Sequence, residues 1–128
     1  MVMSLPLEEM KAAHKLLVEY EYEMRPVVRG YANRTLHINL ETNEMSEKPV
    51  TQQMKDLFTG GRGFGLKLLW DAVTPETKWD DSENALIIAN GPICGTTGYA
   101  GSGKATVVTL SPLTLNVVDS NVGGYFAP

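Results

Sequence analysis

Thr106-Val107-Val108-Thr109-Leu110 and Leu115-Asn116-Val117-Val118-Asp119 are two short runs of mostly β-branched and apolar side chains. Such residues favour strands, because their side chains pack well on a pleated sheet. The segment between the two runs, Ser111-Pro112-Leu113-Thr114, has the composition of a turn. This stretch therefore predicts two strands joined by a turn, and with them a β-sheet in the C-terminal part of the chain.

Upstream of this stretch, the sequence predicts both helices and strands. Apolar and polar residues alternate over residues 34–40, which indicates a half-buried strand, and residues 45–50 would return beside it after a turn. Residues 85–89 form a continuous apolar run, which is typical of a buried strand. Helices are expected at residues 51–58, capped by Thr51, and at residues 66–73. The fold class is therefore α+β.

The N-terminal residues predict an amphipathic helix over residues 4–24, with Ser4 as its cap. Its apolar stripe consists of Met10, Ala13, Leu17, Tyr20 and Met24. The helix would either pack on its own domain or dock on another chain. We assign residues 1–28 to this helical extension and residues 29–128 to a single domain, which is incomplete.

Composition limits the possible partners and location. The formal charge of −4 argues against nucleic acid, whose binding proteins usually carry a basic stripe. The single cysteine excludes an internal disulfide and a four-thiolate cluster built from this chain alone. No secretory signal or bilayer-spanning run is visible, so we expect a soluble, cytoplasmic protein without membrane insertion.

All glycines except Gly30 gather in four blocks, at residues 60–65, 91–95, 98–103 and 123–124. Backbone without side chains can approach a ligand closely and offer N–H groups to a phosphate. The block that ends at Lys104 nearly matches a nucleotide-binding loop, but Ala105 replaces the required hydroxyl residue and a strand-like run follows where a helix is needed. We therefore place little weight on ATP hydrolysis.

Five segments together resemble the opening of the aldehyde:ferredoxin oxidoreductase family, which comprises tungsten or molybdenum enzymes of anaerobic metabolism. They are residues 34–44, Gly60-Gly61-Arg62-Gly63, residues 84–92, Ser111-Pro112-Leu113-Thr114, and Asn121-Val122-Gly123-Gly124-Tyr125-Phe126. The resemblance covers about residues 30–128, and residues 1–28 precede the usual start of the family.

The resemblance implies a platform of two β-sheets beneath a metal held by two pterin dithiolenes. It implies that the backbone carbonyl of Asn121 binds a magnesium ion that links the pterin phosphates, and that Gly123 and Gly124 lie against a phosphate. Gly60, Gly61, Arg62 and Gly63 match a turn near the cofactor, although a helix cap with a surface arginine is the alternative. Lys104 stands where the family commonly has a phosphate-binding arginine.

We therefore expect a cofactor-binding N-terminal piece, or small subunit, of a tungstopterin oxidoreductase that converts an aldehyde to a carboxylic acid or runs a related low-potential reaction. No catalytic residue is assigned, and the isolated chain should be inactive. The tungsten (or molybdenum) bis-pterin and magnesium would be shared with a larger subunit that carries a 4Fe–4S cluster. Ferredoxin or a similar iron–sulfur protein would accept the electrons. The alternative is a non-catalytic carrier or assembly module for the pterin cofactor.

Overall fold

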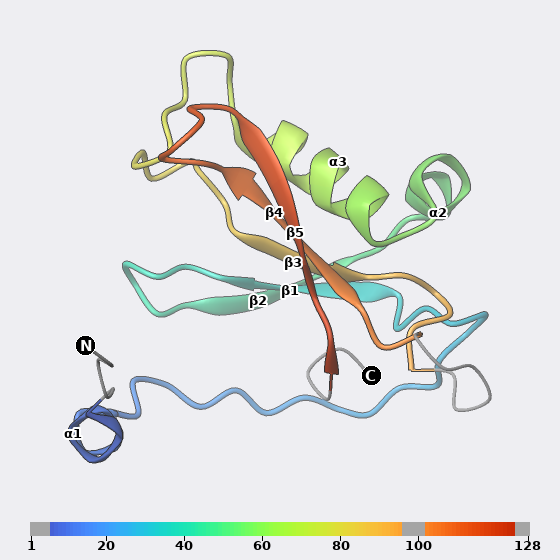
Figure 1. Cartoon of the computed structure of the whole chain (residues 1–128). Coiled ribbons are helices and arrows are strands. Elements are labelled where there is room, and N and C mark those ends of the chain that lie inside the picture. Colours follow the sequence, from blue (N-terminus) through green and yellow to red (C-terminus); the bar gives the residue numbers. More distant parts are fainter. Residues whose placement is uncertain (1–5, 96–101, 125–128) are drawn as a thin grey trace.

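The computed structural model describes residues 6–95 and 102–124 of the chain (Figure 1). Within these residues it confirms the α+β class, with helices and two antiparallel sheets. The elements, in chain order, are α1 (Leu7–Ala12), β1 (Arg34–Ile38), β2 (Met45–Pro49), α2 (Gln52–Phe58), α3 (Arg62–Ala72), β3 (Ile87–Asn90), β4 (Ala105–Leu110) and β5 (Val117–Val122).

The strands form a two-stranded hairpin and a three-stranded sheet. In the hairpin, β1 pairs with β2 so that Leu36 lies opposite Glu47. In the larger sheet, β4 is the central strand, between β3 and β5. Its register places Thr106 opposite Ala89 on one side and Asn121 on the other. Residues from two distant parts of the chain therefore meet on β4.

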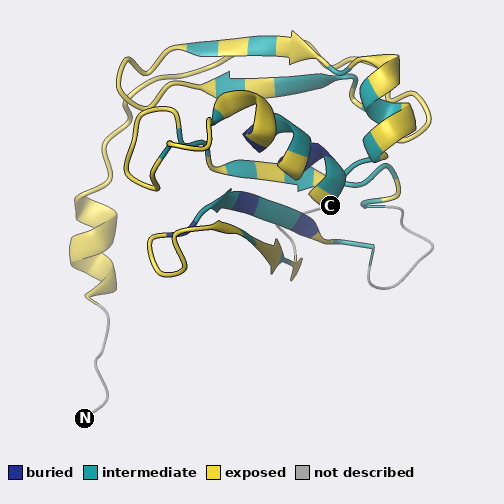
Figure 2. Cartoon of the chain, turned by 90° about the horizontal axis from the view of Figure 1, so that it is seen from above, coloured by how far each residue is buried: buried dark blue, intermediate teal, exposed yellow. Residues whose placement is uncertain are grey.

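The core lies between α3 and the larger sheet (Figure 2). Its buried apolar side chains include Phe64 and Leu69 on α3 and Val108 on β4. A Cβ atom added to Gly65 would lie 2.5 Å from the Val108 Cγ2 atom. Glycine at position 65 therefore allows the helix to approach the sheet closely.

Tyr31 connects the hairpin region to this core. Its ring stacks on that of Phe64, with the ring centres 6.1 Å apart, and its hydroxyl donates a hydrogen bond to the Thr59 carbonyl at 2.6 Å. Nearby, a Cβ atom on Gly30 would lie 1.8 Å from the Pro92 carbonyl oxygen. The backbone before β1 is thus packed directly against the segment that follows β3.

Most predicted elements are present, with shifted ends. The Thr51 hydroxyl caps α2 by accepting a hydrogen bond from the Met54 N–H at 3.1 Å, as predicted. Helix α3 begins earlier than predicted, inside the glycine block, at Arg62. Strand β5 begins later, because Leu115 adopts a positive φ of 54° and its N–H bonds the Ser111 carbonyl. The strand also ends later than predicted, at Val122, so Asn121 belongs to it.

The predicted helix over residues 4–24 is wrong in extent. Ser4 lies outside the described residues, and α1 ends at Ala12 without burying any residue. Short helices are marginal in water unless they pack against something. Residues 18–24 also alternate between apolar side chains and glutamates, Val18-Glu19-Tyr20-Glu21-Tyr22-Glu23-Met24, which is the period of an extended chain. We call residues 13–27, which have no regular secondary structure, the N-terminal arm.

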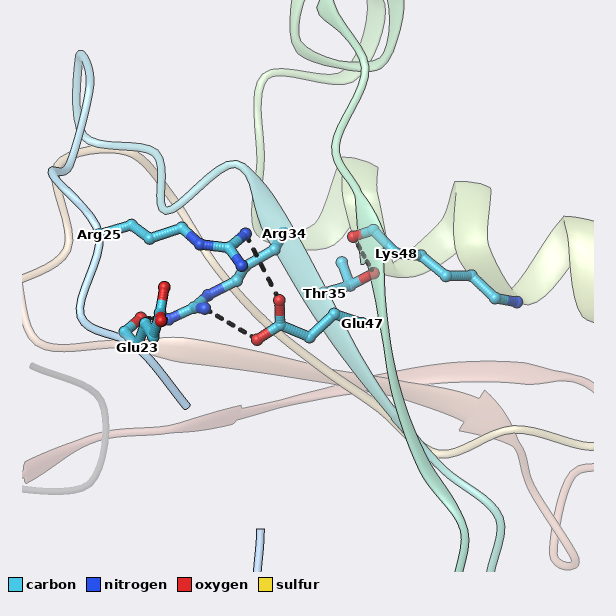
Figure 3. Close-up of polar contacts among 6 residues, drawn as sticks. All are labelled: Glu23, Arg25, Arg34, Thr35, Glu47 and Lys48. Carbon is cyan, nitrogen blue, oxygen red and sulfur yellow. Dashed lines mark hydrogen bonds and ion pairs between the residues drawn. The ribbon is translucent and has the colours of Figure 1, made fainter. Parts of the chain in front are cut away.

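Arg34 on β1 holds the N-terminal arm against the hairpin (Figure 3). Its guanidinium pairs with the Glu47 carboxylate at 2.8 Å and donates to the Glu23 carbonyl at 3.0 Å. The same guanidinium lies 5.3 Å from the ring centre of Tyr22. Arg25 of the arm adds a longer ion pair to Glu47, at 3.5 Å. Tyr20 of the arm also hydrogen-bonds the Glu47 side chain, so the arm is attached to β1 and β2 around Arg34 and Glu47.

Several large apolar side chains stay exposed beside these elements. Leu36 and Ile38 on β1 are 50% and 49% exposed, so the strand's apolar face is only partly covered. Trp70 on α3 is 79% exposed, and it lines an open apolar hollow with Phe58 and Leu66. Among the described residues, no helix is long and apolar enough to cross a membrane.

Candidate functional site

Three of the glycine-containing segments meet at one end of the three-stranded sheet. The Gly61 N–H donates to the carbonyl of Asn90, the last residue of β3, at 2.9 Å. A Cβ atom on Gly61 would lie 3.9 Å from both the Gly91 nitrogen and the Thr106 Oγ1 atom. The start of α3 therefore sits over the end of β3 and the start of β4.

Strand β5 brings the last glycine block to the same end of the sheet. Asn121 lies opposite Thr106, whose hydroxyl is near Gly61. A Cβ atom on Gly123 would lie 3.8 Å from the Gly103 carbonyl oxygen. The register of β4 and β5 thus places Asn121 near the start of α3. Gly123 follows directly after the end of β5. We call this region the glycine edge, made of residues 60–63, 91, 103–106 and 119–124.

Lys104 also lies at the glycine edge, immediately before β4. It is exposed, and its N–H bonds the Ser102 carbonyl at 3.1 Å. A strand follows this lysine, whereas a nucleotide-binding loop requires a helix there. The strand predicted after Lys104 is therefore confirmed, and it does not fit the ATPase motif. Residues 96–101 of that motif lie outside the described residues.

The glycines of this region differ in what requires a glycine at each position. A Cβ atom on Gly63 would lie 2.2 Å from the Phe58 carbonyl oxygen, so internal packing alone requires glycine at position 63. Gly61 and Gly124 have positive φ angles of 50° and 73°, which favour glycine. Among the described residues, a Cβ atom on Gly91 or Gly123 would meet nothing closer than 3.8 Å, and neither glycine has a positive φ. Gly91 is half-buried and Gly123 is exposed, and the open space beside both backbones is the form expected where a ligand comes close.

Gly91 was not among the residues predicted from sequence. Its only sequence signal is its place in a glycine block directly after a predicted strand. Asp119 was also missed, although it lies in the quoted β5 run. Asp119 reaches the site through its ion pair with Arg62, and Gly91 through the packing of Gly61 beside it. Both contacts join distant segments of the chain, and a local sequence pattern does not specify them.

Arg62 is the first residue of α3, and its side chain pairs with Asp119 on β5. The Nε and Nη2 atoms of Arg62 lie 3.0 Å and 2.8 Å from the same oxygen, Oδ2, of Asp119. The arginine side chain remains 61% exposed. The structure thus places a surface arginine at a helix start, as the alternative interpretation expected, and it also brings that arginine to the glycine edge.

The start of α3 supplies few unused amides for an anion. The Gly61 N–H is bonded to Asn90, and the Gly63 N–H is bonded to the Gly60 carbonyl at 3.0 Å. Binding of a phosphate group at the glycine edge would therefore depend on the charges of Arg62 and Lys104. Guanidinium is well suited to this, because its planar N–H groups match two phosphate oxygens at once.

The described residues contain no group of three or more His, Cys, Asp or Glu side chains placed to hold a metal. Cys94, in the loop after β3, directs its Sγ atom toward the Lys104 carbonyl oxygen at 3.6 Å. A metal at the glycine edge would thus have to be held by backbone oxygens, by a cofactor or by other parts of the protein.

Sequence comparison identifies the family. Residues 35–128 match the family described as "Aldehyde ferredoxin oxidoreductase, N-terminal domain". The chain belongs to this family. The N-terminal arm and α1 precede the matched residues.

Curated relatives include oxidoreductases of Pyrococcus species. The chain is 36% identical over 97 residues to the "Tungsten-containing aldehyde ferredoxin oxidoreductase" of Pyrococcus horikoshii, covering 76% of this chain and 16% of the relative. It is 32% identical over 96 residues to the "Aliphatic sulfonate oxidoreductase, WOR-like subunit" of Pyrococcus furiosus, covering 71% of this chain and 15% of the relative. The chain thus spans less than a fifth of the length of either relative.

Among solved structures, the chain resembles the active-site complex BamBC of benzoyl coenzyme A reductase. The TM-score is 0.73 at 33% sequence identity, over 77% of this chain and 15% of that chain. The solved structure was determined with 1,5-dienoyl-CoA. The two-sheet fold is therefore shared with a much longer protein.

Proposed function

We propose that this chain forms the cofactor-binding N-terminal part of a tungstopterin oxidoreductase, and that the glycine edge holds the phosphate end of the pterin. The observation that carries the proposal is the meeting of Gly61, Gly91 and Gly123 beside two cationic side chains. The tungsten-containing relatives support the choice of cofactor.

Each group at the edge has a defined part in this proposal. Arg62 and Lys104 neutralise phosphate charge, and the bare backbone of Gly91 and Gly123 lets the cofactor approach. The carbonyl of Asn121 would bind magnesium, a cation that prefers oxygen ligands. The bound tungsten (or molybdenum) and its pterins would supply two-electron chemistry, while the protein supplies orientation and electrostatics.

The remainder of the oxidoreductase completes the site in this proposal. It would carry the 4Fe–4S cluster, the substrate pocket and the contact with a cytoplasmic ferredoxin. Docking of further protein is supported by two separate apolar features, the exposed Leu36 and Ile38 side chains on one face of β1 and the open hollow beside Trp70 on α3, because exposed apolar surface commonly marks an interface. The reaction would be oxidation of an aldehyde to a carboxylic acid, or a related low-potential step.

Purification of the chain together with the rest of its enzyme tests this function. We expect tungsten or molybdenum, pterin and iron to accompany the complex in fixed ratios. Replacing both Arg62 and Lys104 by glutamine should lower the pterin content, whereas Lys78→Gln, in the loop after α3, should not. Pterin without iron would favour the carrier alternative, and a complex with neither pterin nor metal would refute cofactor binding.

A further inference from the structure

The ion pair between Arg62 and Asp119 occupies the part of the arginine best suited to a phosphate. Arginine binds phosphate with two parallel N–H groups, and here its Nε and Nη2 groups both face one Asp119 oxygen, at 3.0 Å and 2.8 Å. The carboxylate thus takes the position that one phosphate oxygen would take.

The location of Asp119 links this pair to the glycine edge. Asp119 and Asn121 are two residues apart on β5, so their side chains lie on the same face of the sheet. That face is the one toward α3, because Asp119 lies opposite Val108, which packs under Gly65. An anion that reached Asn121 from the start of α3 would therefore meet Arg62 and Asp119 together.

We propose that Asp119 is an internal counter-ion, which holds the Arg62 guanidinium at the glycine edge until a phosphate-bearing ligand displaces it. This inference rests on the proposed function, since the ligand is the phosphate end of the cofactor. The side chains of Arg62 and Asp119 are 61% and 33% exposed, and an exposed ion pair contributes little net free energy. A phosphate with two negative charges can therefore compete with a single carboxylate for the same guanidinium.

The Arg62–Asp119 pair carries almost no net charge, so it attracts a singly charged anion only weakly. The carboxylate would thus favour multiply charged phosphate groups over monovalent anions. A side chain that only positioned Arg62 would have the opposite effect on affinity, since its removal would weaken binding of every anion.

The test is to measure, by calorimetry at low ionic strength, the affinity of the full chain for inorganic pyrophosphate. Asp119→Asn keeps the shape and removes the charge, so it should tighten pyrophosphate binding about two- to five-fold, the range expected for an exposed pair. Asp119→Glu keeps the charge and should bind as the wild type does. In an Arg62→Gln background, Asp119→Asn should change the affinity little.

A second readout reports on the pair itself. Pyrophosphate should shift the NMR signal of the Arg62 Nε–H in the wild type, and Asp119→Asn should shift it before any ligand is added. Weaker or unchanged binding by Asp119→Asn would overturn the proposal. So would the absence of pyrophosphate binding in both the wild type and Asp119→Asn, whereas the proposed function is judged separately, by metal and pterin in the purified complex.

Discussion

Arg34 should determine whether the N-terminal arm stays on the hairpin. The variant Arg34→Met keeps most of the length of the side chain and removes its charge. It would lose the ion pair with Glu47, the hydrogen bond to the Glu23 carbonyl and the contact with the Tyr22 ring. The longer Arg25–Glu47 pair and the hydrogen bond between the Tyr20 and Glu47 side chains would still connect the arm to the hairpin.

The size of the effect follows from these contacts. A hydrogen bond from a charged donor contributes about 1.5 kcal/mol or more, and a cation–π contact about 0.5–1 kcal/mol. The Arg34 and Glu47 side chains are only 16% and 22% exposed, so their pair is worth more than a surface pair. Since the terms are not additive, we expect arm docking to weaken by about 2 kcal/mol, or roughly 30-fold in the docking equilibrium.

Limited chymotrypsin digestion measures this equilibrium, because the arm contains Tyr20 and Tyr22. Cleavage after these residues should become about 30-fold faster in Arg34→Met if docking is fast relative to cleavage. Arg25→Met is the matched control, because Arg25 is 56% exposed and makes only the longer pair. We expect it to change the rate by less than about five-fold. Equal cleavage of wild type and Arg34→Met would refute the assigned role of Arg34.

Two further predictions concern packing and pH. Gly65→Ala should lower the free energy of unfolding in urea by about 2 kcal/mol or more, because its Cβ atom would lie 2.5 Å from the Val108 Cγ2 atom. Gly91→Ala should be nearly neutral, because a Cβ atom there would meet no described neighbour within 4 Å. Equal effects of the two variants would contradict the distinction between glycines required by packing and glycines beside open space. Burial, and secondarily the charge of Lys48, lowers the pKa of His37 below its ordinary value of 6.5. The unfolded chain then binds more protons below that pH, so stability should decrease as the pH falls through about 6.5, and His37→Gln should reduce this dependence. Urea titrations at several pH values measure this dependence. If the free energy of unfolding changed with pH equally in the wild type and in His37→Gln, this role for His37 would be excluded.

The sequence predicted those parts of the fold that local patterns specify. Strand β1, the β-branched run in β4 and the Thr51 cap of α2 each depend on neighbouring residues, and each was confirmed. The burial expected for β1 was not confirmed, because its apolar side chains, Leu36 and Ile38, are the more exposed ones. The arm was mispredicted because Tyr20 and Met24 fit two periods at once, a helical stripe and a strand-like alternation. The structure shows that residues 18–24 contact Arg34 and Glu47 in an extended form, which a single-segment pattern does not reveal.

The site was only partly predictable for a similar reason. Glycine blocks and the resemblance to a family indicated Arg62, Asn121 and Gly123 as neighbours of a cofactor. The Arg62–Asp119 pair joins residues 57 positions apart, and the open position of Gly91 depends on how α3 meets β3. These features follow from tertiary packing.

Anomalous X-ray diffraction at the tungsten absorption edge, from crystals of this chain with the rest of its enzyme, tests the central claim most directly. Our account predicts a tungsten–pterin whose phosphate end contacts the glycine edge, within hydrogen-bonding distance of Arg62 and beside Gly91 and Gly123. A metal and pterin bound elsewhere, with the glycine edge covered by protein, would contradict it.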